Sequence, residues 1–232
     1  NLNKMTVKID ADAKASSFNF LKDYNYLKSG TNKLNIIITK DINSKNWVAS
    51  IKSDLFASDI EFNFINYKKP ANTRGNLSGT FYFSGNKLTK IKNLNFFTDN
   101  IIMEGSLYYD GDTKLKKIHI DEYIFEKNNF SVTVLYEKNG NRKVKIDGAS
   151  IDLVNFVNSK NKNNNNLIFS LDIEKLYYGD QYFGTATLEA KINNSLLQNI
   201  KGELFYNDKP YVKFKDIEYE EKKFKKILFR FD

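Results

Sequence analysis

The strongest constraint on the fold of this chain is an alternation of apolar and polar residues that recurs along most of its length. Phe81 and Phe83 alternate with hydroxyl-bearing residues, and Val132 and Val134 are separated by Thr133. Period-two alternation places the apolar side chains of a β-strand on one face and the polar side chains on the other. Repeated segments of this kind predict an all-β chain whose sheet has one apolar face.

Short turn sequences separate the alternating segments. Residues 84–86 read Ser-Gly-Asn, residues 110–112 read Asp-Gly-Asp, and residues 139–141 read Asn-Gly-Asn. Such turns are typical of tight β-hairpins, so we expect successive strands to be antiparallel neighbours. The sequence therefore predicts a long, curved, antiparallel β-sheet, a meander of hairpins, that forms a groove with an apolar inner face.

Two segments depart from the alternation. Ser16 and Ser17 precede apolar residues at helical spacing and Gly30 follows them, which predicts one short helix near residues 16–29. The Asn-rich stretch 159–166 predicts a polar loop. We expect residues 1–232 to form a single β-rich segment, and, because the sequence opens on Asn1 and soon reads as strand, a segment of a larger protein.

The basic charge of the chain does not favour a nucleic-acid partner. The formal net charge is +8, but 33 of the 36 basic residues are lysines. Recognition of phosphates and base edges favours the planar fork of arginine, and the lysines here are scattered rather than clustered. We therefore expect no nucleic-acid binding, whereas an anionic lipid remains compatible with the charge.

Residues with catalytic potential are few and isolated. The chain has no cysteine and one histidine, His119, which alternation directs away from the apolar face. Asp10 and Asp12 share a strand face, as do Asp172 and Glu174, but alternation directs the second pair towards water. No glycine-rich phosphate loop or nucleophile elbow is present. We expect no enzymatic activity, no metal site and no cofactor.

What remains is the apolar face, which has two interpretations. It is either the ordinary core of a β-sandwich or a hydrophobic groove that accepts acyl chains, and the pattern alone favours the core. The residues that would line such a groove are the inward apolar side chains of the clearest strands. They are Phe81, Phe83, Met103, Leu107, Tyr109, Val132, Val134, Tyr136, Leu188 and Ile192.

Several strands open on a glycine and then alternate, at residues 79–83 (Gly-Thr-Phe-Tyr-Phe), 105–109 (Gly-Ser-Leu-Tyr-Tyr), 184–188 (Gly-Thr-Ala-Thr-Leu) and 202–205 (Gly-Glu-Leu-Phe). These units resemble the AsmA-like superfamily of bacterial envelope proteins, of the YhdP type. The resemblance covers much of residues 76–206 and rests on degenerate motifs. It does not extend to the early helix or to the stretch around Trp47 and Pro70.

The resemblance implies a periplasmic protein, tethered to the inner membrane by a segment outside this chain, that shields phospholipid acyl chains during transport between the inner and outer membranes. It implies phospholipid as the ligand, with lysines at the groove rim meeting headgroup phosphates. Outer-membrane or other envelope proteins are further expected partners. The alternatives are a non-catalytic structural or interaction module, such as a β-sandwich, and a surface adhesin or outer-membrane β-barrel. The many lysines on the strands disfavour an outer-membrane barrel, whose outward face must be apolar.

Overall fold

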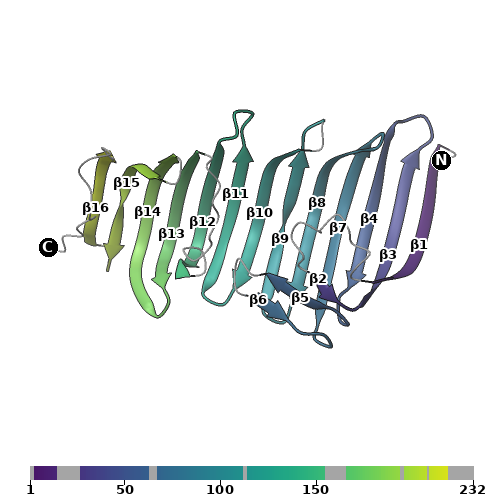
Figure 1. Cartoon of the computed structure of the whole chain (residues 1–232), viewed down its shortest axis with the longest axis horizontal. Helices are drawn as coiled ribbons and strands as arrows, with labels where there is room; N and C mark the ends of the chain where they lie inside the picture. The colour runs from purple at the N-terminus through teal and green to yellow at the C-terminus, as the bar shows by residue number, and fades with distance from the viewer. Residues whose placement is uncertain are drawn as a thin grey trace. The chain divides into compact units, whose positions relative to one another are not determined.

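The computed structural model describes residues 3–14, 27–62, 67–111, 114–154, 166–193, 196–207 and 209–218, and they form strands β1 to β16 (Figure 1). Most of the predicted helix near residues 16–29 lies outside the described residues. Where that segment enters them, at Leu27–Ser29, it forms strand β2. The Asn-rich loop 159–166 also lies outside them, except for its last residue.

The chain divides into two compact units. Unit 1 comprises residues 1–116 and 120–126, and unit 2 comprises residues 117–119 and 127–232. The first strands are β1 (Lys4–Lys14), β2 (Leu27–Ser29), β3 (Thr31–Asp41), β4 (Asn46–Asp54), β5 (Asp59–Phe62), β6 (Tyr67–Lys69), β7 (Gly75–Ser84), β8 (Lys87–Thr98), β9 (Ile101–Tyr109) and β10 (Leu115–Phe125). They are followed by β11 (Asn128–Tyr136), β12 (Arg142–Asp152), β13 (Leu167–Tyr178), β14 (Gln181–Asn193), β15 (Leu196–Tyr206) and β16 (Lys209–Glu218).

Thirteen of these strands form one sheet in the order β1-β3-β4-β7-β8-β9-β10-β11-β12-β13-β14-β15-β16. The predicted all-β sheet of successive hairpins is thus confirmed. The prediction that successive strands are antiparallel neighbours is wrong in two respects. Strands β2, β5 and β6 are left out of this sheet, and β12 and β13 are parallel. A parallel pair cannot be joined by a tight turn, since the chain must return to the starting end of the first strand. Residues 153–166 make that return, and Arg142 N donates to Asn166 O over 2.9 Å where β13 begins.

In unit 1 a second, small sheet forms from β2, β5 and β6. It arises because β1 pairs with β3 and β4 pairs with β7, so that β2 and the segment that holds β5 and β6 leave the main sheet. In Figure 1 the small sheet lies across one end of β7 and β8. It therefore covers part of one face of unit 1.

The buried apolar side chains of unit 1 come from both sheets and from the turn after β4, and those of unit 2 come from the main sheet. In unit 1 they are Ala49, Leu55, Ile60, Tyr67, Ile91, Phe96, Ile101, Ile120, Tyr123 and Phe125. In unit 2 they are Phe130, Ile146, Ile151, Leu171, Ile173, Leu176, Ala186 and Leu204.

A glycine fixes the approach of two strands in unit 2. Gly184 has a φ of 85°, a conformation that residues with a Cβ rarely adopt. A Cβ at this position would overlap the carbonyl oxygen of Phe205 on β15. The register of the β13–β14 pair also shifts on either side of the contact between Leu176 and Gly184. Glycine here is required both by the backbone conformation and by the closeness of the neighbouring strand.

Candidate functional site

In unit 1 the strand register aligns apolar side chains into rows across the sheet. Residues directly opposite one another in neighbouring strands project from the same face. One row consists of Val7, Ile38, Ala49, Phe81, Ile91 and Leu107. Phe83 and Tyr109 lie two residues further along β7 and β9, and Met103 lies opposite Phe96 on β8. All five lining residues predicted in unit 1 therefore share one face.

The five lining residues predicted in unit 2 also share a face. The rows there are Val132, Ile146, Leu171 and Leu188; Val134, Val144, Phe169 and Ala190; and Tyr136, Arg142, Leu167 and Ile192. The parallel pairing of β12 with β13 does not disturb the arrangement, because Ile146 still lies opposite Leu171. Period-two alternation thus predicted the shared face correctly in both units.

Burial along this face of unit 2 is graded. The side chains of Ile173 and Ala186, which lie opposite each other in one row, are both 0% exposed. Two rows further along the strands, Val134 and Phe169 are half-buried, and so are Tyr136 and the other members of the last row. Each apolar face contains a buried part and a half-exposed part. All ten predicted lining residues are half-buried.

In unit 1 the small sheet covers the buried part of the face. Phe62 of β5 meets Phe96 of β8 edge to face, with ring centroids 5.3 Å apart. Tyr67 of β6 donates from its hydroxyl to Thr98 Oγ1 over 2.7 Å and packs its ring against Phe125 at 5.5 Å. Because these contacts lie at the Thr98 end of β8, the opposite end of the face is not covered by the small sheet.

That opposite end holds the only tryptophan of the chain. The indole of Trp47 stacks on the ring of Phe83, with centroids 3.8 Å apart and planes 2° from parallel. Trp47 Nε1 donates to Gly85 O over 2.7 Å. Tyr109 lies on the same face, and its burial raises the pKa of its hydroxyl above the ordinary value of 10.0. The half-exposed part of the face is therefore aromatic.

A buried lysine holds the small sheet of unit 1 in place. Lys69 is 1% exposed, and its Nζ donates to Ser58 O over 2.9 Å and to Pro70 O over 3.2 Å. Its burial lowers the pKa of the ammonium group below 10.5, although the carboxylate of Asp59 opposes the shift. Ser29 Oγ and the backbone N–H of Ala71 both donate to Asp59, which lowers the pKa of that carboxyl group.

The lowered pKa of Lys69 gives a pH-dependent stability. Above the native pKa of Lys69 and below about pH 10.5, the unfolded chain holds the proton more tightly than the folded chain does. We expect the free energy of unfolding to rise with pH in this window, and Lys69→Met to abolish that contribution. Urea denaturation across the alkaline range measures it, with Lys68→Met at the exposed neighbouring position as the control. An identical pH profile for Lys69→Met and the parent would contradict the assignment.

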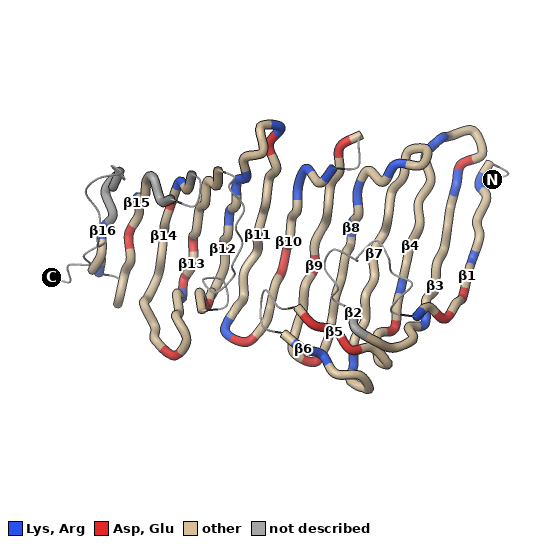
Figure 2. The backbone as a smooth tube through the Cα atoms, in the orientation of Figure 1, with Lys and Arg blue, Asp and Glu red and all other residues tan. Residues whose placement is uncertain are grey.

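The opposite face of each unit is polar. Each unit also has a surface hollow, and most of the residues that line it are polar. One hollow in unit 1, of about 730 Å³, is lined by residues of β1, β3, β4 and β7, among them the charged residues Asp10, Asp12, Lys33, Lys52 and Asp54 and the apolar residues Ala11, Leu34 and Leu77. Both signs of charge gather at these strand ends in Figure 2. A hollow in unit 2, of about 340 Å³, is lined by Ser170, Asp172, Thr187, Glu189, Lys201 and Glu203, with backbone between them. Neither hollow was predicted from the sequence.

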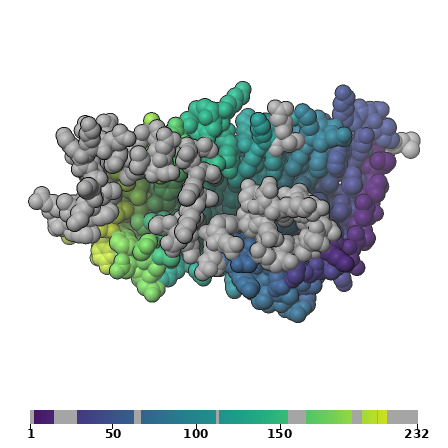
Figure 3. All heavy atoms as spheres, in the orientation of Figure 1, coloured from purple at the N-terminus to yellow at the C-terminus, as the bar shows by residue number. Residues whose placement is uncertain are grey.

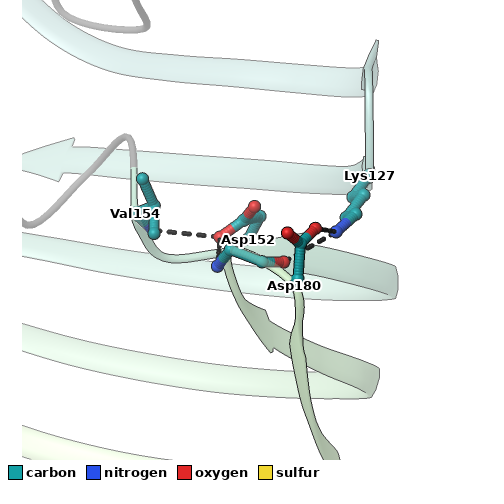
Figure 4. Close-up of polar contacts among 5 residues, drawn as sticks. Lys127, Asp152, Val154 and Asp180 are labelled. Atoms are coloured by element: carbon teal, nitrogen blue, oxygen red, sulfur yellow. Dashed lines mark hydrogen bonds and ion pairs between the residues drawn. The ribbon is translucent and has the colours of Figure 1, made fainter.

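Polar contacts in unit 2 tie together three chain segments that are distant in sequence (Figure 4). Asp152, at the end of β12, accepts from Val154 N over 3.1 Å and from Gly179 N over 2.9 Å. Lys127 donates to Gly179 O over 2.7 Å and to Asp180 Oδ1 over 2.9 Å. The hydrogen bond from Lys127 lowers the pKa of Asp180 and raises that of Lys127. These contacts fix the point where the chain leaves β12 for the crossover to β13.

The residues considered for catalysis belong to different strands: Asp10 and Asp12 to β1, His119 to β10, and Asp172 and Glu174 to β13. His119 Nδ1 is 2.8 Å from Thr133 Oγ1, and Thr133 belongs to the polar face because it lies opposite Lys145. Asp10 accepts from Asn35 Nδ2 over 2.7 Å. Asp172 and Glu174 are exposed, as predicted. Within the described ranges, no group of three or more His, Asp or Glu side chains is arranged to hold a metal ion.

No helix among the described residues combines the length and apolar character needed to span a bilayer. Comparison of the chain with protein-family models, with curated proteins and with solved structures gives no match.

Proposed function

We propose that the half-exposed parts of the apolar faces bind phospholipid acyl chains, and that the chain is a segment of an AsmA-like, YhdP-type periplasmic protein. In this proposal the parent protein is tethered to the inner membrane and moves phospholipid between the inner and outer membranes. The observation that carries the proposal is that all ten aligned lining residues are left half-buried.

The energetic support is the cost of wetting apolar side chains. Leaving apolar surface in water costs about 25 cal/mol for each Å². Rows such as Phe81, Ile91 and Leu107 cross the strands, so they offer a run of apolar contacts rather than isolated ones. An acyl chain is flexible, has no hydrogen-bonding groups and can follow such a row. Its binding would remove apolar surface from water on both partners.

Arg142 supplies a group for the anionic headgroup in unit 2. It belongs to the half-exposed row of the apolar face, between Tyr136 and Leu167. Its guanidinium carbon lies 5.4 Å from the centroid of the Tyr136 ring, and its Nε is buried without a hydrogen-bond partner. A guanidinium group is well shaped to bind phosphate oxygens. We therefore assign the headgroup phosphate to Arg142 rather than only to the lysines at the rim.

Fluorescence of Trp47 tests where the lipid binds. Phosphatidylglycerol with brominated acyl chains should quench Trp47, because the indole lies on the apolar face against Phe83. The control is the double variant Trp47→Phe, Val48→Trp, which moves the only indole to the neighbouring position on the polar face, opposite Tyr82. Quenching of the parent but not of this variant supports the proposal, and equal quenching of both contradicts it.

Native mass spectrometry with lipid extraction provides the second measurement. Bound phospholipid should be lost on Arg142→Gln if the phosphate contact is correct. The exposed neighbour Lys143, which pairs with Glu137 on the polar face, provides the control Lys143→Gln. Lipid retained by both variants would remove the headgroup assignment while leaving the acyl-chain site intact. A folded protein that binds none of the added lipid would remove both.

A second candidate is a structural or interaction module in which the apolar face is simply core. The small sheet covers Phe96 and Thr98, so this part of the face is packed like the interior of an ordinary protein. That packing favours the second candidate. This candidate predicts no bound lipid and no quenching of Trp47. The same two experiments therefore distinguish the candidates.

A further inference from the structure

Strand β1 forms an edge of the main sheet that is well suited to pairing. Among the described residues it pairs only with β3, over all eleven residues and without a register shift. It contains no proline, and its apolar-face positions carry no charge. Met5, Val7 and Ile9 are exposed by 51%, 39% and 40%. In Figures 1 and 3 this purple strand lies at the margin of unit 1.

The other edge of the sheet differs. Strand β16 contains Pro210, which lacks a backbone donor, and its pairing with β15 shifts register twice. Prolines and bulges are devices that prevent edge strands from pairing further. Strand β1 has neither of them.

One hydrogen bond shows which backbone groups of β1 point away from β3. Ile42 N donates to Asn3 O over 2.9 Å, so the odd-numbered residues of β1 direct their backbone groups towards β3. The even-numbered residues, from Lys4 to Lys14, therefore direct theirs outward. A new antiparallel partner must place its own outward groups opposite these even-numbered residues.

We propose that the partner of β1 is β1 of a second copy of this chain, paired antiparallel about a two-fold axis at Ile9. This is the register in which all eleven residues overlap. It places Lys8 of each copy opposite Asp10 of the other copy. Even-numbered residues lie opposite even-numbered residues, so the outward backbone groups of the two strands meet. The proposal does not depend on lipid binding.

The side chains on the apolar face fit this register as well. Ile9 meets its own copy at the axis, Val7 meets Ala11, and Met5 meets Ala13, so that large side chains face small ones. The like-charged pair in this register, Lys4 with Lys14, lies at the solvent-exposed ends. A register shifted by one residue in each copy instead places Lys8 opposite Lys8 at the centre.

Charge reversal tests the register. Lys8→Asp places two carboxylates opposite each other on both sides of the axis, and Asp10→Lys places two ammonium groups there. Each variant should dimerise about tenfold more weakly than the parent in sedimentation equilibrium. The double variant should recover, and an equimolar mixture of the two single variants should form heterodimers. Variants that dimerise as tightly as the parent would overturn the assignment.

Disulfide cross-linking provides an independent readout, because the chain has no cysteine. A pair of residues opposite each other without backbone hydrogen bonds lies about 4.5 Å apart at Cα, within reach of a disulfide. Ile9→Cys should therefore form a covalent dimer on mild oxidation, and Val7→Cys should not. A monomeric parent at every concentration, cross-linking at position 7 rather than 9, or assemblies larger than a dimer would each refute the proposal.

Discussion

Replacement of Gly184 by alanine should destabilise unit 2 by about 3 kcal/mol. The added Cβ would overlap the carbonyl oxygen of Phe205, so β14 and β15 would have to move apart. The φ of 85° adds the strain of a left-handed conformation. Hydrogen exchange of peptides from β14 and β15 measures the loss locally, and urea denaturation measures it for the whole chain.

Gly85 provides the matched control. It also has a positive φ, of 58°, but nothing lies within 4 Å of a Cβ built there. Gly85→Ala should therefore cost only the conformational strain, about 1 kcal/mol. If the two substitutions destabilise the protein equally, crowding against Phe205 is not what requires glycine at position 184.

Truncation of the apolar face of unit 2 should have sharply different effects along its gradient of burial. Ile173→Ala should cost about 3 kcal/mol, because this side chain is completely buried and its removal leaves a cavity. Leu188→Ala should cost about 1 kcal/mol, because Leu188 is half-buried and has less contact to lose. Urea denaturation of the two variants gives the comparison.

The same pair of variants separates stability from ligand binding. Under the proposed function, Leu188→Ala weakens lipid binding in a protein that remains folded. Binding that is unchanged in Leu188→Ala would count against its role in the lining, whatever the stability. A cost for Leu188→Ala equal to that for Ile173→Ala would show that this part of the face is packed as core.

The sequence predicted where strands form and which side chains share a face, because both follow from the alternation of apolar and polar residues within each strand. Phe81 and Leu107 were assigned to one face from alternation within their own strands, and the register confirms it. Graded burial was not predictable, because it depends on what covers the face. The small sheet over Phe96 forms because β1 pairs with β3 and β4 pairs with β7, which leaves β2, β5 and β6 to pair with one another.

The parallel pairing of β12 with β13 could not be read from alternation, which is the same for both strand directions. The clue lay in the long polar stretch between the strands, in place of a two-residue turn. Lys69 was missed for a different reason. Its main partner, Ser58 O, is a backbone atom eleven positions away, and no residue type in the sequence reveals such an acceptor.

The parallel pairing also bears on how the chain folds. A hairpin closes from its turn, so each new hydrogen bond forms between residues already held close together. Between β12 and β13 the sequence separation is the same for Arg142 with Leu167 as for Asp152 with Tyr177, so no pair is near enough to start the others. The chain must lose the full entropy of closing the intervening loop before the first contact between the strands can stabilise the pair. The seam between these two strands should therefore form late, and the strands from β13 onward should join the sheet as one preassembled block.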